Sequence, residues 1–230
     1  MNNPNLKPLI DAARLLRPVL DELVFVGGCV TGLLISDKAA TGVRPTFDVD
    51  VITEATTYTE YAHLSERLRK LGFVEDTGEG APLCRWFNGD TRLDVMPLDE
   101  KILGFSNPWY LPAIETAQAF ELEKGFYIRV LTAPYFCATK IVAFKDRGHG
   151  DYLSSHDLED VITVVDGRPE LLAELQSAPH DVRHYVASAI GELLDTRQFV
   201  DALPGYLLSD AASQGRIGSL LAMLEQISKL

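Results

Sequence analysis

Two carboxylates inside an apolar, β-branched run constrain the fold of this chain more than any other feature. The segment 47–52 reads FDVDVI. Side chains alternate between the two faces of a strand, so Asp48 and Asp50 point to the same face. Asp94 has similar apolar flanks in the segment 92–96, RLDVM. We therefore expect two strands of one sheet that bring three carboxylates together on one face.

Strand and helix patterns mix up to about residue 132, and only helical patterns follow. Apolar or alternating runs predict strands at 23–26, 48–53, 83–87, 91–96 and 127–131. Apolar residues at helical spacing predict helices at 6–22, 29–35, 57–71, 134–145, 155–165, 169–176, 181–194 and 209–230. Asn88-Gly89-Asp90 predicts a hairpin turn. These patterns favour an α+β fold, with a mixed sheet flanked by helices at 1–132 and an all-helical domain at 133–230.

The composition is that of an acidic globular protein, with 230 residues, a formal net charge of −12 and a pI near 4.8. This acidity argues against a protein that coats nucleic acid, and it is compatible with a bound divalent cation. The three cysteines form no CxxC pair, which favours reduced thiols in a cytoplasm. The N-terminal residues lack a signal-peptide pattern, and no apolar run is long enough to span a bilayer. We expect a cytoplasmic protein without membrane contact.

Three carboxylates on neighbouring strands predict a metal site. Asp48, Asp50 and Asp94 would repel one another strongly unless a cation lay between them. Mg²⁺ is the expected ion because it is hard and prefers carboxylate and phosphate oxygens, and Mn²⁺ is the alternative. Two such ions can clamp the attacking and leaving oxygens of a phosphoryl displacement. The three aspartates are therefore the predicted metal ligands.

A glycine pair lies at the end of the first predicted strand. Because Gly27 and Gly28 have no Cβ, a triphosphate can approach the backbone closely, and the helix that follows offers free N–H groups. Taken alone, a glycine pair is merely a turn, and most DxD pairs are surface residues or caps. The order of glycines, acidic strand and second acidic strand favours the functional interpretation. The absence of GxGxxG and GxxxxGK[ST] motifs argues against a dinucleotide fold or a P-loop.

A second group of charged residues lies in the helical half. Lys140 has apolar neighbours at helical spacing, which indicates either snorkelling to the surface or phosphate binding. Arg147 and the segment 157–160, DLED, follow it. Asp157 is either a first-turn carboxylate in a helix capped by Ser154 or a residue of the functional site. We favour phosphate binding for the lysine and a role in the site for Asp157.

The first set of motifs resembles the nucleotidyltransferase superfamily related to DNA polymerase β. The matching residues are Gly27-Gly28, Asp48-Val49-Asp50 and Asp94. The 19 residues between Gly28 and Asp48 are more than the pattern usually has, and we interpret the segment 37–45 as a loop insertion. A glycine also replaces the commoner serine of the pattern. This resemblance implies a nucleotidyltransferase fold and an enzyme that uses Mg²⁺ and an NTP.

The second set looks like the AbiEii-type branch of that superfamily, which includes toxins of type IV toxin–antitoxin pairs and the MenT-like toxins. Lys140, Arg147 and the DLED segment match its pattern in order. The resemblance implies that Asp48, Asp50, Asp94 and Asp157 are catalytic. It also implies that Gly27, Gly28, Lys140 and Arg147 bind the nucleotide, so that the helical domain contributes to the nucleotide site.

The resemblance further implies that a nucleoside monophosphate passes from an NTP to an acceptor hydroxyl. The acceptor would be an RNA such as a tRNA end, or a protein, and the chain would be a toxin with a cognate antitoxin. One alternative is an enzyme that modifies an antibiotic or another small cationic molecule, which suits the acidity of the chain. Another alternative is a degenerate, non-catalytic nucleotide-binding module.

Overall fold

The structure, a computed structural model, describes residues 3–40 and 42–230. Part of the predicted loop at 37–45 and the first two residues of the N-terminal segment lie outside the described residues. The chain divides into two compact units. The sheet unit comprises Pro4–Val30 and Pro45–Thr132, and the helical unit comprises Thr31–Arg44 and Ala133–Leu230.

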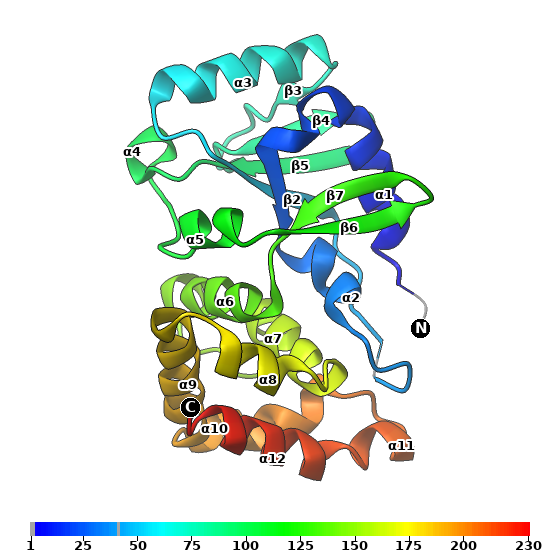
Figure 1. The fold of residues 1–230 in the computed structure, drawn as a ribbon, viewed down its shortest axis with the longest axis vertical. Coiled ribbons are helices and arrows are strands. Elements are labelled where there is room, and N and C mark those ends of the chain that lie inside the picture. Colours follow the sequence, from blue (N-terminus) through cyan, green and yellow to red (C-terminus); the bar gives the residue numbers. More distant parts are fainter. Residues whose placement is uncertain (1–2, 41) are drawn as a thin grey trace. The chain divides into compact units, whose positions relative to one another are not determined.

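A mixed seven-stranded sheet forms the centre of the sheet unit (Figure 1). Its strands are β1 (Leu23–Val26), β2 (Asp48–Thr53), β3 (Val74–Glu75), β4 (Arg85–Asn88), β5 (Thr91–Met96), β6 (Gln118–Glu123) and β7 (Phe126–Val130). Their spatial order is β3-β4-β5-β2-β1-β7-β6. β2 pairs parallel to β5 and antiparallel to β1, and β1 pairs parallel to β7. The predicted α+β class, with a mixed sheet and flanking helices, is confirmed.

Helices and 3₁₀ turns flank this sheet. They are α1 (Leu6–Leu15), η1 (Arg17–Glu22), η2 (Gly28–Val30), α3 (Tyr58–Lys70), α4 (Glu100–Leu103) and α5 (Tyr110–Glu115). α1 contacts β2 and β5, and α5 contacts β2. α3 begins with a capping box between Thr57 and Glu60 and is followed by Gly72, whose φ is +88°. The side chains of β1 are all buried in this core.

The helical unit has no strand among its described residues. Its elements are α2 (Thr31–Leu34), α6 (Ala133–Arg147), α7 (His156–Gly167), α8 (Leu171–Ser177), α9 (His180–Leu194), α10 (Arg197–Ala202), η3 (Leu203–Tyr206), α11 (Ala211–Gln214) and α12 (Ile217–Ile227). α6 packs against α7, α8 and α9, and α12 packs against the same three helices. α6 is the central element, because ten of its fifteen residues are buried.

The residues between the glycine pair and the acidic strand group with the helical unit. Arg216 donates hydrogen bonds to Asp37 at 2.8 Å and to Asp166 at 2.9 Å. Arg168 donates to the carbonyl oxygen of Leu34 at 2.7 Å. Arg44 donates to Asp160 at 3.1 Å. This segment is therefore anchored along its described length, and α2 replaces the longer helix predicted at 29–35.

Three further predicted elements are wrong in extent. The helix expected at 6–22 ends at Leu15, because Pro18 lacks a backbone N–H and disfavours helical geometry in the residue before it. The helix expected at 209–230 is divided into α11 and α12 around Gly215. The strand expected at 83–87 begins only at Arg85, as β4. β6 and the short helices α4, α5 and α10 were not predicted at all.

Within the described residues, no helix is long and apolar enough to cross a membrane.

Candidate functional site

Asp48, Asp50 and Asp94, here named the carboxylate triad, lie together on two adjacent strands. Asp48 and Asp50 belong to β2 and Asp94 belongs to β5, and the parallel pairing sets Asp50 directly beside Asp94. One carboxylate oxygen from each residue lies within 4.8 Å of the others. The alternation along β2 produces this arrangement, because Val49 and Val51 are buried on the opposite face.

Arg85 is a member of this site that the sequence analysis missed. It lies on β4, paired with Asp94 across the antiparallel β4–β5 ladder. Its Nε and Nη2 donate to the two oxygens of Asp94 at 2.8 and 2.7 Å. Its Nη2 also lies 3.4 Å from Asp48 Oδ2. The hydrogen bond to Asp94 raises the pKa of Arg85 above its usual value, so the guanidinium remains charged.

The triad fits a hard divalent cation. All three donors are carboxylates, which Mg²⁺ and Mn²⁺ accept, and they lie close enough to share an ion. The local potential is also negative. Burial raises the pKa of Cys84 to about 12, and the charges of Asp94 and Asp50 add to that rise. This site therefore holds more negative charge than Arg85 neutralises.

Gly27 makes room for Asp50. A Cβ at Gly27 would lie 1.9 Å from Asp50 Oδ2, and the φ of Gly27 is +69°. Only glycine satisfies both conditions without displacing the carboxylate. The sequence predicted a glycine here for the approach of a phosphate, and the structure adds the close approach of Asp50.

We predict that Gly27→Ala disrupts the triad. The added methyl group must displace Asp50, so we expect Mn²⁺ binding to weaken about tenfold or more. Gly125→Ala is the matched control, because Gly125 has a φ of +74° and a Cβ there would meet no atom within 4 Å. In both variants the free energy of unfolding should fall by about 1 kcal/mol, because alanine is strained at a positive φ. Isothermal calorimetry with Mn²⁺ checks the prediction, and equal affinities in the two variants would contradict it.

Asn5 is a second residue that the sequence analysis missed. It is buried, with 1% of its surface exposed. Its side chain donates to the carbonyl oxygen of Gly28 at 3.4 Å and accepts from the backbone N–H of Thr46 at 2.9 Å. Thr46 in turn donates its hydroxyl to Asp48 Oδ1 at 2.7 Å. Asn5 thus connects the glycine turn to the residues that lead into the acidic strand.

Within the helical unit, the charged residues that the sequence singled out on α6 and α7 form a mostly buried cluster. The ammonium of Lys140 lies 3.1 Å from Asp157 Oδ1 and 2.6 Å from Asp160 Oδ2. The Nε and Nη2 of Arg147 each donate to Asp157 at 2.9 Å. Arg44 completes the cluster through Asp160. Lys140 therefore does not snorkel to the surface; it is only 8% exposed.

Asp157 lies in the first turn of α7. The cap of this helix is Ser155, which accepts from the backbone N–H of Leu158, and not Ser154 as predicted. The helix begins one residue later than the Ser154 cap requires, so the side chain of Ser155 reaches the first free N–H groups. Burial raises the pKa of Asp157, but the hydrogen bond from Arg147 and the charge of Lys140 outweigh burial and leave the pKa below its usual 3.8.

We predict that Asp157 stabilises the protein only while it is ionised. Its pKa is lower in the folded state than in the unfolded chain, so its contribution is complete above about pH 4 and is lost as pH falls through the folded-state pKa. The difference in unfolding free energy between the wild type and Asp157→Asn should therefore shrink with acidification below pH 4. Urea unfolding at pH 6, 4 and 3 measures it, and a difference that does not change with pH would refute this assignment.

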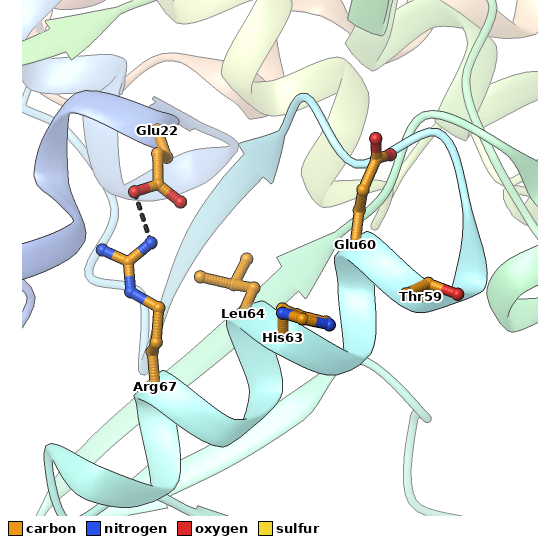
Figure 2. A pocket seen from close by; sticks show the side chains of 6 residues that line it. All are labelled: Glu22, Thr59, Glu60, His63, Leu64 and Arg67. Atoms are coloured by element: carbon orange, nitrogen blue, oxygen red, sulfur yellow. Dashed lines mark hydrogen bonds and ion pairs between the residues drawn. The ribbon is translucent and has the colours of Figure 1, made fainter.

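An open depression of about 360 Å³ lies beside α3, and none of the predicted site residues lines it (Figure 2). Its lining residues are Glu22, Thr59, Glu60, His63, Leu64 and Arg67. Arg67 forms an ion pair with Glu22, and Glu60 accepts from the backbone N–H groups of Thr56 and Thr57. These polar groups connect η1 to α3 and cap α3, so they stabilise the fold.

The comparisons with known proteins agree with the fold. No protein-family model and no curated protein matches the sequence. The chain is similar to the solved structure of an antigenic nucleotidyltransferase-like protein from Paracoccidioides brasiliensis, with 17% identity, a TM-score of 0.50 and coverage of 91% of this chain and 96% of that chain. A Helicobacter pylori protein, JHP933, has 12% identity and a TM-score of 0.48 over 96% of this chain and 92% of that chain.

At such identities a likeness concerns the fold alone, and of these two structures the first has a TM-score of 0.50. The chain has an α+β fold similar to that of a nucleotidyltransferase-like protein, and its sheet presents three carboxylates that could hold a metal ion.

Proposed function

We propose that this protein is a metal-dependent nucleotidyltransferase, which moves a nucleoside monophosphate from an NTP to an acceptor hydroxyl. One observation carries the proposal. Carboxylate oxygens of Asp48, Asp50 and Asp94 lie within 4.8 Å of one another, in a chain with a nucleotidyltransferase-like fold. Such a set of oxygens suits Mg²⁺, or alternatively Mn²⁺, better than any role in the protein core.

The three aspartates share one proposed role, and Asp94 has a second. Asp48, Asp50 and Asp94 would hold the metal, with two ions as the expected number, and the metal would neutralise phosphate charge. The acceptor oxygen attacks the α-phosphorus, the bond to the β-phosphate oxygen breaks and pyrophosphate leaves. Asp94 receives the hydroxyl proton. Gly27 and Gly28 remain the proposed nucleotide-binding residues of the sheet unit, and catalysis is mainly positioning and charge neutralisation.

The residues of the helical unit keep their proposed roles toward the nucleotide. Arg147 is suited to phosphate, because 71% of its side chain is exposed while Asp157 fixes its guanidinium through two hydrogen bonds. Lys140 is paired with Asp157 and Asp160. Asp157 therefore supports the two cations and, in our proposal, acts on turnover through them.

The acceptor is the finer part of the proposal. The resemblance to the AbiEii-type branch favours an RNA such as a tRNA end, or a protein, and would make this chain the toxin of a pair with a cognate antitoxin. The net charge of −12 favours the alternative acceptor, a small cationic molecule such as an antibiotic. A non-catalytic nucleotide-binding module is a further alternative, and the three intact carboxylates argue against it.

Two experiments test the proposal. Thermal melts with and without Mg²⁺ and each of the four NTPs should show stabilisation that requires both components, since a ligand that binds only the folded state raises the melting temperature. Incubation with α-³²P-labelled NTPs and separate pools of tRNA, cell protein and aminoglycosides should then transfer label to one pool. A protein that is neither stabilised nor able to label any pool would contradict the proposed function.

A further inference from the structure

Arg85 supplies a positive charge inside the carboxylate triad, and the backbone holds it there. Its neighbours Cys84 and Trp86 are 4% and 1% exposed, so alternation along β4 fixes Arg85 on the opposite face from them, the face of the triad. The hairpin pairing aligns its Cα with that of Asp94. Its side chain is 19% exposed, and it contacts both Asp94 and Asp48. Moving it away would break a charge-assisted, two-pronged hydrogen bond.

We propose that Arg85 is a positioning residue that holds Asp94 and Asp48 in place when no metal is bound and competes with divalent metal for their oxygens. This inference rests on the proposed function, because it assumes that the triad binds a divalent ion. Arg85 would thereby weaken metal binding to the free protein.

The charges and contacts support this competition. The three carboxylates and the one guanidinium that contacts Asp94 and Asp48 sum to a charge of −2, and loss of this guanidinium changes the sum to −3. Arg85 already occupies both oxygens of Asp94. An ion that binds Asp94 must therefore share its oxygens with the guanidinium or displace it. In either arrangement the positive charge of Arg85 opposes the charge of the ion.

The test is a titration of Mn²⁺ into the full-length protein without nucleotide, followed by electron paramagnetic resonance of the free ion. The variants are Arg85→Gln and, as a control, Arg92→Gln. Arg92 lies on β5 two residues before Asp94, and its guanidinium lies over the ring of Phe87, 5.8 Å from the centroid. Both substitutions remove one positive charge near the triad, but only the first removes the contacts to Asp94 and Asp48.

We expect Arg85→Gln to bind Mn²⁺ about tenfold more tightly or better than the wild type, and Arg92→Gln to stay within about threefold. Without metal, Arg85→Gln should melt at a lower temperature than the wild type, and Mn²⁺ should recover the loss. Should Arg85→Gln not fold without metal, Mn²⁺ is expected to restore a cooperative transition, because the ion replaces the missing cation; failure to restore it overturns the proposal.

The two remaining outcomes separate this inference from the proposed function. If the wild type binds Mn²⁺ and Arg85→Gln binds it no more tightly, the competition is wrong while the metal site stands. If neither the wild type nor the two variants bind Mn²⁺, both the metal site and the role of Arg85 are overturned.

Discussion

Replacing Asp50 with asparagine is expected to lower nucleotidyl transfer about 10³-fold or more, because the metal contributes several kcal/mol to the transition state. An amide keeps the shape of the side chain but removes the charge that holds the ion. The metal-free variant should melt at the same temperature as the wild type or higher, because removing one carboxylate relieves repulsion from Asp94. Initial rates of pyrophosphate release and thermal melts without metal measure the two effects.

Asp90→Asn is the matched control for this variant. Asp90 lies in the exposed hairpin turn before β5, in the same unit, and loses the same charge without touching the triad. Its rate should equal that of the wild type. A wild-type rate in Asp50→Asn would contradict the assignment of the triad, and an Asp50→Asn protein that has lost its fold would contradict the account of repulsion.

The second large effect concerns stability. Lys140→Met should lower the unfolding free energy by about 3 kcal/mol, because it leaves two buried carboxylates without their shared ammonium. Methionine keeps the length and apolar contacts of the lysine stem, so the loss reports the charge. Arg147 and Arg44 remain beside Asp157 and Asp160, which keeps the expected loss at the lower end for a broken buried pair. Urea unfolding at pH 7 measures it.

Lys145→Met on the same helix is the control. Lys145 is 43% exposed, and its partner Glu192 on α9 is 61% exposed. Removing this pair should cost at most about 1 kcal/mol, as for other exposed ion pairs. A Lys140→Met variant that loses no more than the control would show that the cluster contributes little to stability and would return Lys140 to a purely ligand-binding role.

Local patterns were enough to predict the acidic strand. Alternation places Asp48 and Asp50 on one face, and the structure gives the strand the predicted limits, 48–53. Alternation does not reveal which strand lies beside it. The pairing of Asp50 with Asp94 joins residues that are far apart in the chain, and parallel pairing leaves no turn from which the register can be counted.

Arg85, in contrast, was accessible from the sequence. A two-residue turn at Gly89 and Asp90 pairs Asn88 with Thr91, and counting back along the hairpin brings Arg85 opposite Asp94. The predicted hairpin therefore already contained the register that places a guanidinium beside the third carboxylate. The motif of acids and glycines does not include this residue, which is found only by following the partner of each acid across the ladder.

The position of the segment 31–44 could not be predicted in this way. Its contacts are with residues more than a hundred positions later, such as Asp37 with Arg216 and Arg44 with Asp160. No local periodicity encodes such pairs, so the sequence predicted only a helix at 29–35 and a loop insertion at 37–45. The strand β6 was not predicted for another reason: it is largely exposed and contains two glutamates, which are uncommon in strands.

The position of the bond that breaks in the NTP tests the central claim most directly. Parallel reactions would contain the protein, Mg²⁺, the acceptor pool that accepts label, and an NTP labelled with ³²P at either the α or the γ position. We expect label on the acceptor from the α position only, with γ label released in pyrophosphate, and no transfer with EDTA or with Asp50→Asn. Transfer of γ label, or transfer that persists in Asp50→Asn, would contradict the account.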